Sequence, residues 1–153
     1  MGYTESKVMA ISEGGKNGTP ADWGASEAPL LRVNQPCDLF AVGALITTVL
    51  DTALSTITVT RRTLPGSDGS GATAATVVAT IIVPHLTAVG KIVYMAPLAA
   101  KTVANQLPVK LNAGDELQFS ASGGGGSFKW RPWIEAYPRP ETKANNSDFQ
   151  LST

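Results

Sequence analysis

Apolar and polar residues alternate along the last third of the chain, in residues 106–138. Val109 and Leu111 flank a lysine, and Leu117 and Phe119 alternate with glutamate, glutamine and serine. A period of two residues is typical of a β-strand with one dry face and one face in water. The pattern therefore predicts two strands here, each with a defined inner face.

Glycine-containing segments separate these runs. Residues 112–114 lie between the first two, and a glycine in the last position suits a hairpin because glycine adopts a left-handed backbone at little cost. Glycines 123–126 precede a third run, in which one parity carries Phe128, Trp130, Ile134 and Ala136, and the other carries Lys129, Arg131, Trp133, Glu135 and Tyr137. We therefore expect three consecutive strands in one antiparallel sheet layer.

The most apolar segment spans residues 37–50 and has apolar side chains on both parities. One parity carries Leu39, Ala41, Leu45 and Val49, and the other carries Phe40, Val42, Ala44, Ile46 and Leu50. This pattern indicates a strand that is buried on both faces. A buried helix is the alternative, but the β-branched residues and Gly43 favour a strand. Such a strand lies either in the centre of the core or at a subunit interface.

Four further segments, residues 29–34, 54–63, 75–83 and 88–96, also predict strands. The third places Val77, Ala79, Ile81 and Val83 on one face. Residues 98–105 predict a short helix or a loop. Pro132 lacks an N–H, so its position in the last strand must be an edge or a bulge. About eight or nine strands with frequent turn signals predict an all-β fold, an antiparallel β-sandwich of the jelly-roll type.

The sandwich is expected in residues 29–138, between an extended N-terminal arm (1–28) and an extended C-terminal tail (139–153). Both extensions are polar and rich in residues that favour turns or disorder. Tyr3 and Trp23 in the arm and Phe149 in the tail are among the exceptions. Because Trp rarely stays fully in water, the arm either docks on a neighbour or folds back onto its own domain.

Composition narrows the expected partners. Lys+Arg and Asp+Glu both number 12, so the net charge is zero and nucleic acid is not an expected partner. Only 16% of residues are charged, which suggests that a partner covers part of the surface and, together with the two-sided apolar segment at residues 37–50, favours a homo-oligomer. The apolar run at residues 40–50 is shorter than the roughly 20 residues of a membrane span, and the N-terminus lacks a secretion signal. We therefore expect no membrane partner and synthesis in a cytosol.

Few residues are able to carry chemistry. His85 is the only histidine and Cys37 the only cysteine, so the usual zinc ligand sets and an intrachain disulfide cannot be assembled. His85 follows Pro84 without a nucleophile motif nearby, which disfavours a catalytic triad. Asp115 and Glu116 are adjacent carboxylates, and neighbours on a strand point to opposite faces, so they cannot easily share a substrate. The simpler interpretation is a turn aspartate followed by a solvent-facing glutamate. We expect no enzyme activity, no cofactor and no metal site.

The outward parity of the last strand combines aromatic and charged side chains. Trp, Tyr and Arg are enriched at binding hot spots. Candidate contact residues for a partner or a second subunit are Tyr3, Trp23, Arg131, Trp133, Tyr137 and Phe149. Trp133 could instead be covered by the adjacent tail. An aromatic strip also stacks on sugar rings, so a carbohydrate- or receptor-binding module is an alternative.

Residues 82–84, 89–92 and 108–117 carry a resemblance to the head decoration, or cement, proteins of tailed bacteriophages, which are small jelly-roll structural proteins. The resemblance covers residues 29–137. It implies a virion protein, made in the host cytoplasm, that binds the major capsid protein on the capsid exterior and reinforces the head as a dimer or trimer. A strand, an Ala-Gly-Asp turn and a second strand also occur in phage tail and fibre modules, so a tail, baseplate or fibre component is the alternative.

Overall fold

The computed structural model describes residues 8–11, 22–24, 28, 30–49, 53–63, 74–123 and 128–139. These residues form two antiparallel sheets and contain no helix, which confirms the predicted all-β sandwich of jelly-roll type. The strands are β1 (Val8–Ile11), β2 (Trp23–Gly24), β3 (Leu30–Arg32), β4 (Cys37–Thr48), β5 (Ser55–Thr63), β6 (Ala74–Val83), β7 (Ile92–Met95), β8 (Val109–Leu111), β9 (Glu116–Gly123) and β10 (Lys129–Pro138).

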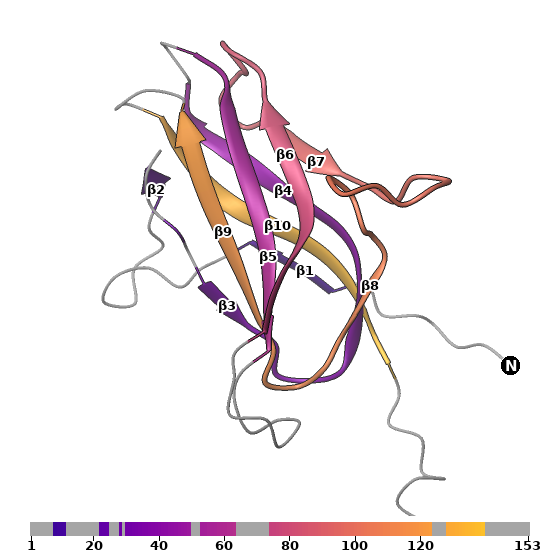
Figure 1. The fold of residues 1–153 in the computed structure, drawn as a ribbon. Helices are drawn as coiled ribbons and strands as arrows, with labels where there is room; N and C mark the ends of the chain where they lie inside the picture. The colour runs from indigo at the N-terminus through magenta and orange to yellow at the C-terminus, as the bar shows by residue number, and fades with distance from the viewer. Residues whose placement is uncertain are drawn as a thin grey trace, which may run out of the picture.

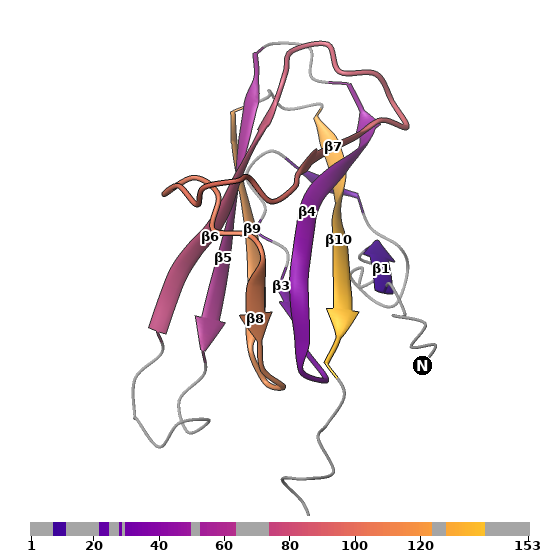
Figure 2. The same cartoon turned by 90° about the vertical axis from the view of Figure 1, so that its right-hand side faces the viewer.

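Sheet A has the order β1-β10-β4-β7, with β2 also paired to β10 and β8 also paired to β4. Sheet B has the order β3-β9-β5-β6. In Figure 1, β9, β5 and β6 lie in front of β10 and β4. Figure 2 shows the sandwich from its side, with β5 and β6 in one layer and β4 and β10 in the other.

Strand β4 lies in the middle of sheet A, between β10 on one side and β7 and β8 on the other. Leu39, Val42 and Ile46 point into the core and are fully buried. Ala41 and Gly43 are buried too, although they belong to the opposite face. The prediction of a strand with burial on both faces is confirmed for residues 41–44 in the centre of sheet A, whereas Phe40 and Thr48 nearer its ends are exposed.

The core lies between the two sheets. Its largest fully buried side chains are Trp130, Phe119 and Phe128. The rings of Phe119 in sheet B and Trp130 in sheet A meet with their centroids 6.3 Å apart. Trp130 Nε1 donates a hydrogen bond to the carbonyl oxygen of Gly24 at 3.2 Å, so this buried polar group is satisfied.

The predicted three-strand layer of residues 106–138 is wrong. β8 pairs with β4 in sheet A, β9 pairs with β3 and β5 in sheet B, and β10 returns to sheet A. Gly114 does adopt the expected left-handed backbone, with φ of 92°, but its turn carries the chain from one sheet to the other. Alternation specifies which side of each strand is dry, and it does not specify which sheet the strand joins.

One irregularity in sheet B shifts a predicted face. The pairing of β5 with β6 slips by one residue, so that Val59 faces Ala79 and Thr60 faces Val77. Val78 occupies the inserted position and is buried, whereas Val77 is 39% exposed. The prediction that Val77 shares the inner face is therefore wrong, because a bulge adds one residue to the period.

Residues 98–105 form a loop, not the alternative short helix. The loop reaches the outer edge of β6, where Thr80 N donates to Ala104 O and Gln106 N donates to Val78 O, each at 2.8 Å. Asn105 is buried beneath it and bonds the loop at both ends: its Nδ2 donates to Ala96 O, and its Oδ1 accepts from Leu107 N. In a helix these backbone N–H and C=O groups would bond to one another within the segment. Their bonds to β6 therefore favour the loop over the helix.

Pro132 pairs with Ala44 of β4, but neither β1 nor β2 pairs with it on the other side of β10. It therefore lies at an interruption of the sheet, as predicted.

The N-terminal arm is less separate than expected, because β1 and β2 both pair with β10 and Trp23 packs against the core. Beyond residue 139 the predicted tail lies outside the described residues. No helix in the described segments has the length and apolar character needed to cross a membrane.

Candidate functional site

The outer face of sheet A carries an aromatic pair built over a glycine. Gly43 of β4 lies between Trp133 of β10 and Tyr94 of β7 in one cross-strand row. A Cβ atom on Gly43 would lie only 2.7 Å from the Val93 carbonyl oxygen, so β7 approaches β4 too closely for any side chain here. The rings of Tyr94 and Trp133 meet across this position, with centroids 5.8 Å apart.

The two rings differ in exposure. Trp133 is 6% exposed and Tyr94 is 61% exposed. The indole N–H of Trp133 has no acceptor in the described part of the chain, so packing alone holds this ring. The buried Trp133 ring therefore packs against the Tyr94 ring, and the Tyr94 ring provides the accessible aromatic surface.

A second aromatic pair lies nearer the start of β4. The pairing of β4 with β10 skips Phe40, because Leu39 faces Ala136 and Ala41 faces Glu135. This bulge turns Phe40 outward, so the expectation that it shares a face with Val42, Ala44 and Ile46 is wrong. Phe40 is 38% exposed and meets Tyr137 edge to face, with centroids 5.7 Å apart.

These two rings line a groove of about 430 Å³ whose other lining residues are Asp38, Pro108, Val109 and Lys110. The groove combines aromatic surface with one carboxylate and one ammonium group. The Tyr137 hydroxyl donates to Glu135 Oε1 at 3.0 Å, and Asp38 lies 3.4 Å from the Arg139 guanidinium. We define the aromatic face as Tyr94 and Trp133 together with this groove.

The sequence-predicted contact residues are only partly brought together. Trp133 and Tyr137 lie on the aromatic face, and Arg131 lies on the same side of β10, where its Nε contacts Asp22 at 2.6 Å. Trp23 packs against the core instead, so the alternative that the arm folds back holds for this residue. Tyr3 and Phe149 lie outside the described residues.

Sequence reasoning missed Phe40 and Tyr94 as surface aromatics. Alternation gave no outward signal for Tyr94, because Lys91 shares the parity of Val93 and would place that parity in water, whereas Val93 packs against the core and Tyr94 is exposed. Phe40 gave no outward signal either, since its outward direction depends on the bulge opposite β10.

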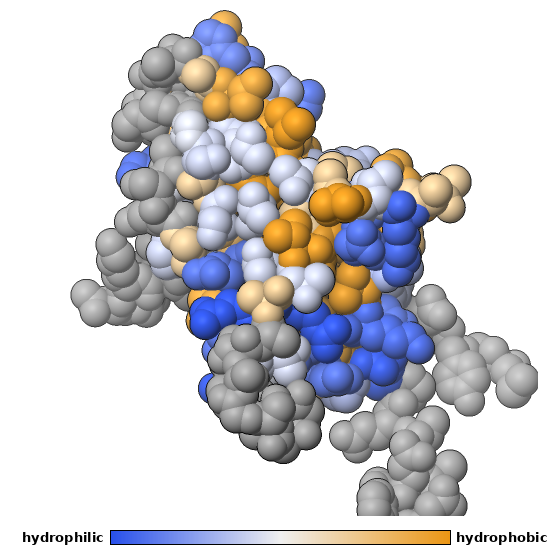
Figure 3. All heavy atoms as spheres, viewed as in Figure 1, coloured by the Kyte–Doolittle hydropathy of each residue, from blue (hydrophilic) through white to orange (hydrophobic). Residues whose placement is uncertain are grey.

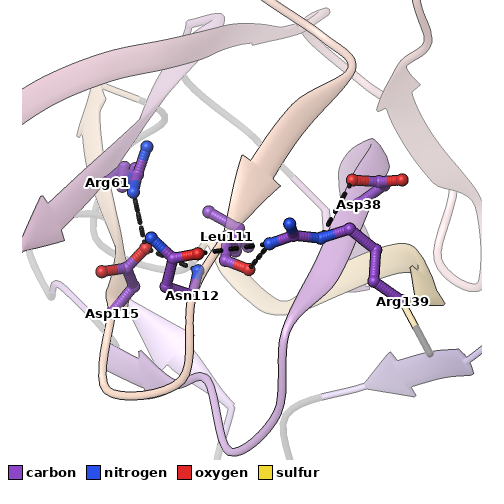
Figure 4. Close-up of polar contacts among 6 residues, drawn as sticks. All are labelled: Asp38, Arg61, Leu111, Asn112, Asp115 and Arg139. Atoms are coloured by element: carbon purple, nitrogen blue, oxygen red, sulfur yellow. Dashed lines mark hydrogen bonds and ion pairs between the residues drawn. The ribbon is translucent and has the colours of Figure 1, made fainter. Parts of the chain in front are cut away.

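A polar network holds the turn between β8 and β9, and Figure 4 shows its residues. Asp115 is buried, and its Oδ2 accepts from Asn112 N at 2.9 Å and from Arg61 Nε at 3.0 Å. Arg139 Nη2 donates to Leu111 O at 2.6 Å. The carboxylate that sequence analysis assigned to a turn thus has a structural role, and Arg61 neutralises it.

Cys37 lines a second, largely apolar slot of about 310 Å³ between the sheets. Burial raises the pKa of its thiol, and the nearby Arg139 guanidinium opposes part of this effect. A raised pKa disfavours the thiolate, which is the reactive form. His85 is exposed in the turn after β6. Among the described residues, no three His, Cys, Asp or Glu side chains gather as a set of metal ligands.

No protein-family model and no curated protein matches this chain. A solved structure that it resembles is the N-terminal endo-1,4-β-D-xylanase 10B of Clostridium thermocellum, with CBM22-1 and GH10 modules, complexed with xylohexaose. The sequences are 14% identical and the TM-score is 0.43. The match covers 88% of this chain but spans only 25% of that one.

Proposed function

We propose that this protein is a non-enzymatic structural protein of a bacteriophage virion, which binds the outer surface of the capsid and stabilises the head. Two arguments support the proposal. The first is the resemblance of residues 82–84, 89–92 and 108–117 to cement proteins. The second, which carries the proposal, is the exposed ring of Tyr94 on strand β7 at the end of sheet A, which contacts the Trp133 ring across Gly43.

The aromatic face suits protein binding for a physical reason. Tyr94 and Phe40 stand on paired strands and each contacts a second ring, so little side-chain freedom remains to be lost on binding. Aromatic side chains in this situation provide a large share of binding energy at protein interfaces. Asp38, Lys110 and Arg131 surround them with both signs of charge, as in the polar rim of an interface.

Cosedimentation with capsids that lack this protein tests the proposal. We expect the wild-type chain to pellet with the capsids and Tyr94→Ala to bind about tenfold more weakly, which corresponds to about 1.4 kcal/mol. Val103→Ala is the matched control, because it removes another exposed apolar side chain, 87% exposed, in the loop before β8. Absence of wild-type protein from the pellet, or equal weakening by both variants, would contradict the proposal.

Immunogold labelling of intact virions distinguishes the head from other sites of the particle. Label over the capsid is the expected result. Label confined to the tail or baseplate would replace the capsid role with that of a tail, baseplate or fibre component. Absence of label on any virion would exclude a virion protein.

A carbohydrate-binding module is the second candidate, and the groove is the observation that favours it. Phe40 and Tyr137 offer aromatic surface, while Asp38 and Lys110 offer an acceptor and a donor for sugar hydroxyls. Trp133 is too buried to offer its ring to a sugar. A glycan array tests this function: it requires a signal that Phe40→Ala abolishes, and an array without signal removes the candidate.

A further inference from the structure

The outer face of sheet B forms a surface of a different character. Its strands bring together three cross-strand rows, and we define the threonine face by their residues: Ser122, Thr56 and Ile82; Ser120, Thr58 and Thr80; and Leu30, Gln118, Thr60 and Val77. Figure 3 shows it as a pale central band over β9, β5 and β6, with orange aliphatic groups nearby. Hydroxyl and methyl groups dominate its centre.

None of these ten side chains ionises. Charge begins only in the next row, where Arg62 and Glu116 approach to 3.9 Å beside Arg32. Three aliphatic side chains at the edges of the threonine face are exposed: Leu30 by 46%, Val77 by 39% and Ile82 by 58%. The outer side of sheet A differs, because ionisable residues occur there on β4, β8 and β10.

We propose that the threonine face packs against the same face of a second copy of this chain, in a dimer with two-fold symmetry. Ionised groups of a charged partner would lose water and gain only hydroxyl or amide contacts from this face, without an opposite charge, which is costly. A flat and uncharged partner surface avoids this cost. The threonine face meets this requirement itself, and a two-fold axis presents it to its own copy without like-charge repulsion.

The area of the threonine face also indicates how strong the dimer contact should be. Ten residue positions, each covering about 4.8 Å across the strands and about 6.7 Å along them, give a flat area of about 320 Å² per copy. Stable complexes bury about 800 Å² per partner, so a contact of this size is expected to be weak and transient. Small hydroxyl-bearing side chains allow two such sheets to approach to about 10 Å.

Such a dimer carries its two aromatic faces on opposite sides, because each sheet A lies behind its own sheet B. One dimer then bridges two binding sites, and occupation of the first raises the effective concentration at the second. The inference does not rest on the capsid role, since it concerns a different sheet and a different partner.

Sedimentation velocity from about 1 to about 500 μM, which brackets the affinity of a small interface, tests the dimer. We expect the wild-type chain to change from monomer to dimer across this range. Thr58→Lys and Thr58→Glu, at the middle of the threonine face, should each remain monomeric because like charges meet across the two-fold axis. An equimolar mixture of the two variants should regain the dimer, since opposite charges then face each other.

Thr48→Lys is the matched control, an exposed threonine at the end of β4 in sheet A, and it should dimerise like the wild type. Ser120→Lys repeats the test beside Thr58 if Thr58→Lys fails to melt cooperatively. A wild-type chain that stays monomeric throughout overturns the inference. So do Thr58→Lys or Ser120→Lys chains that dimerise normally, and a mixture of the two Thr58 variants that stays monomeric.

Discussion

Gly43 illustrates how the absence of a side chain shapes a surface. In the middle of sheet A, glycine is a poor strand former, yet here it allows β7 to approach β4 and two rings to cover the position from outside. Cross-strand aromatic rings over a glycine protect the backbone from water and compensate for the missing contacts. The exposed Tyr94 and the buried Trp133 are thus two consequences of one small residue.

Gly43→Ala should destabilise the protein by about 1–3 kcal/mol, the usual cost of forcing an extra methyl group into a packed site. The new Cβ would lie 2.7 Å from Val93 O and 2.9 Å from Tyr94 Cβ, so β7 must move. Urea denaturation measures the change, and tryptophan fluorescence, to which Trp133 contributes together with Trp23 and Trp130, should report a looser environment. Thr48→Ala, at an exposed end of the same strand, should change the stability by less than about 0.5 kcal/mol. An unchanged Gly43→Ala midpoint would show that β7 adapts freely.

At the scale of single elements, β6 depends on a loop far along the chain. Its ten residues hold no ionisable side chain, and on one side it pairs with β5. On its other side, residues 104 and 106 bond to the backbone of Val78 and Thr80. Asn105 fixes this segment through both oxygen and nitrogen of its amide.

Asn105→Ala should therefore cost about 1–3 kcal/mol, because Leu107 N–H and Ala96 C=O lose their partner in a largely buried place. Hydrogen exchange is the direct measurement: the amides of Gln106 and Thr80 should lose protection before the rest of sheet B. Gln106→Ala, which keeps the backbone bonds, is the control. Equal protection in Asn105→Ala and wild type would refute the role given to this amide.

The elements themselves were largely predictable, whereas their partners were not. Alternation in β9 and β10 and the two-sided apolar pattern of β4 are local properties, and they gave the strands and their dry faces. The bulges at Phe40 and Val78 depend on the strand opposite, so no periodicity within one segment contains them. This is why Phe40 was assigned to the core and Val77 to the inner face of its strand.

At the scale of the whole molecule, the turn between β8 and β9 joins the two sheets. Asp115 receives hydrogen bonds from this turn and from Arg61 on β5, while Arg139 after β10 binds the same turn from the other sheet. The sequence placed Asp115 in a turn correctly, but the ionic partner at position 61 is 54 residues away and had no local signal.

Asp115→Asn should lower the free energy of unfolding by about 2 kcal/mol or more, since a buried charge-assisted contact is weakened and the Arg61 guanidinium loses its counter-ion. Glu116→Gln is the matched control, because its contact with Arg62 is longer and more exposed, and such pairs contribute about 0–1 kcal/mol. Thermal melting of both variants tests the difference. Equal effects would mean that Asp115 acts as an ordinary surface charge.

The loop bonded to β6 affects how readily the protein forms fibrils at high protein concentration. A long, uncharged, β-branched strand with open backbone groups is a template for fibrils, and here residues 104–106 occupy the middle of that template. Mild heating that detaches residues 104–106 from β6 should then produce material that binds thioflavin. The two sheets should remain folded at that temperature and unfold cooperatively only at a higher one. Many copies packed closely together would resist fibril formation only while residues 104–106 stay bonded to β6.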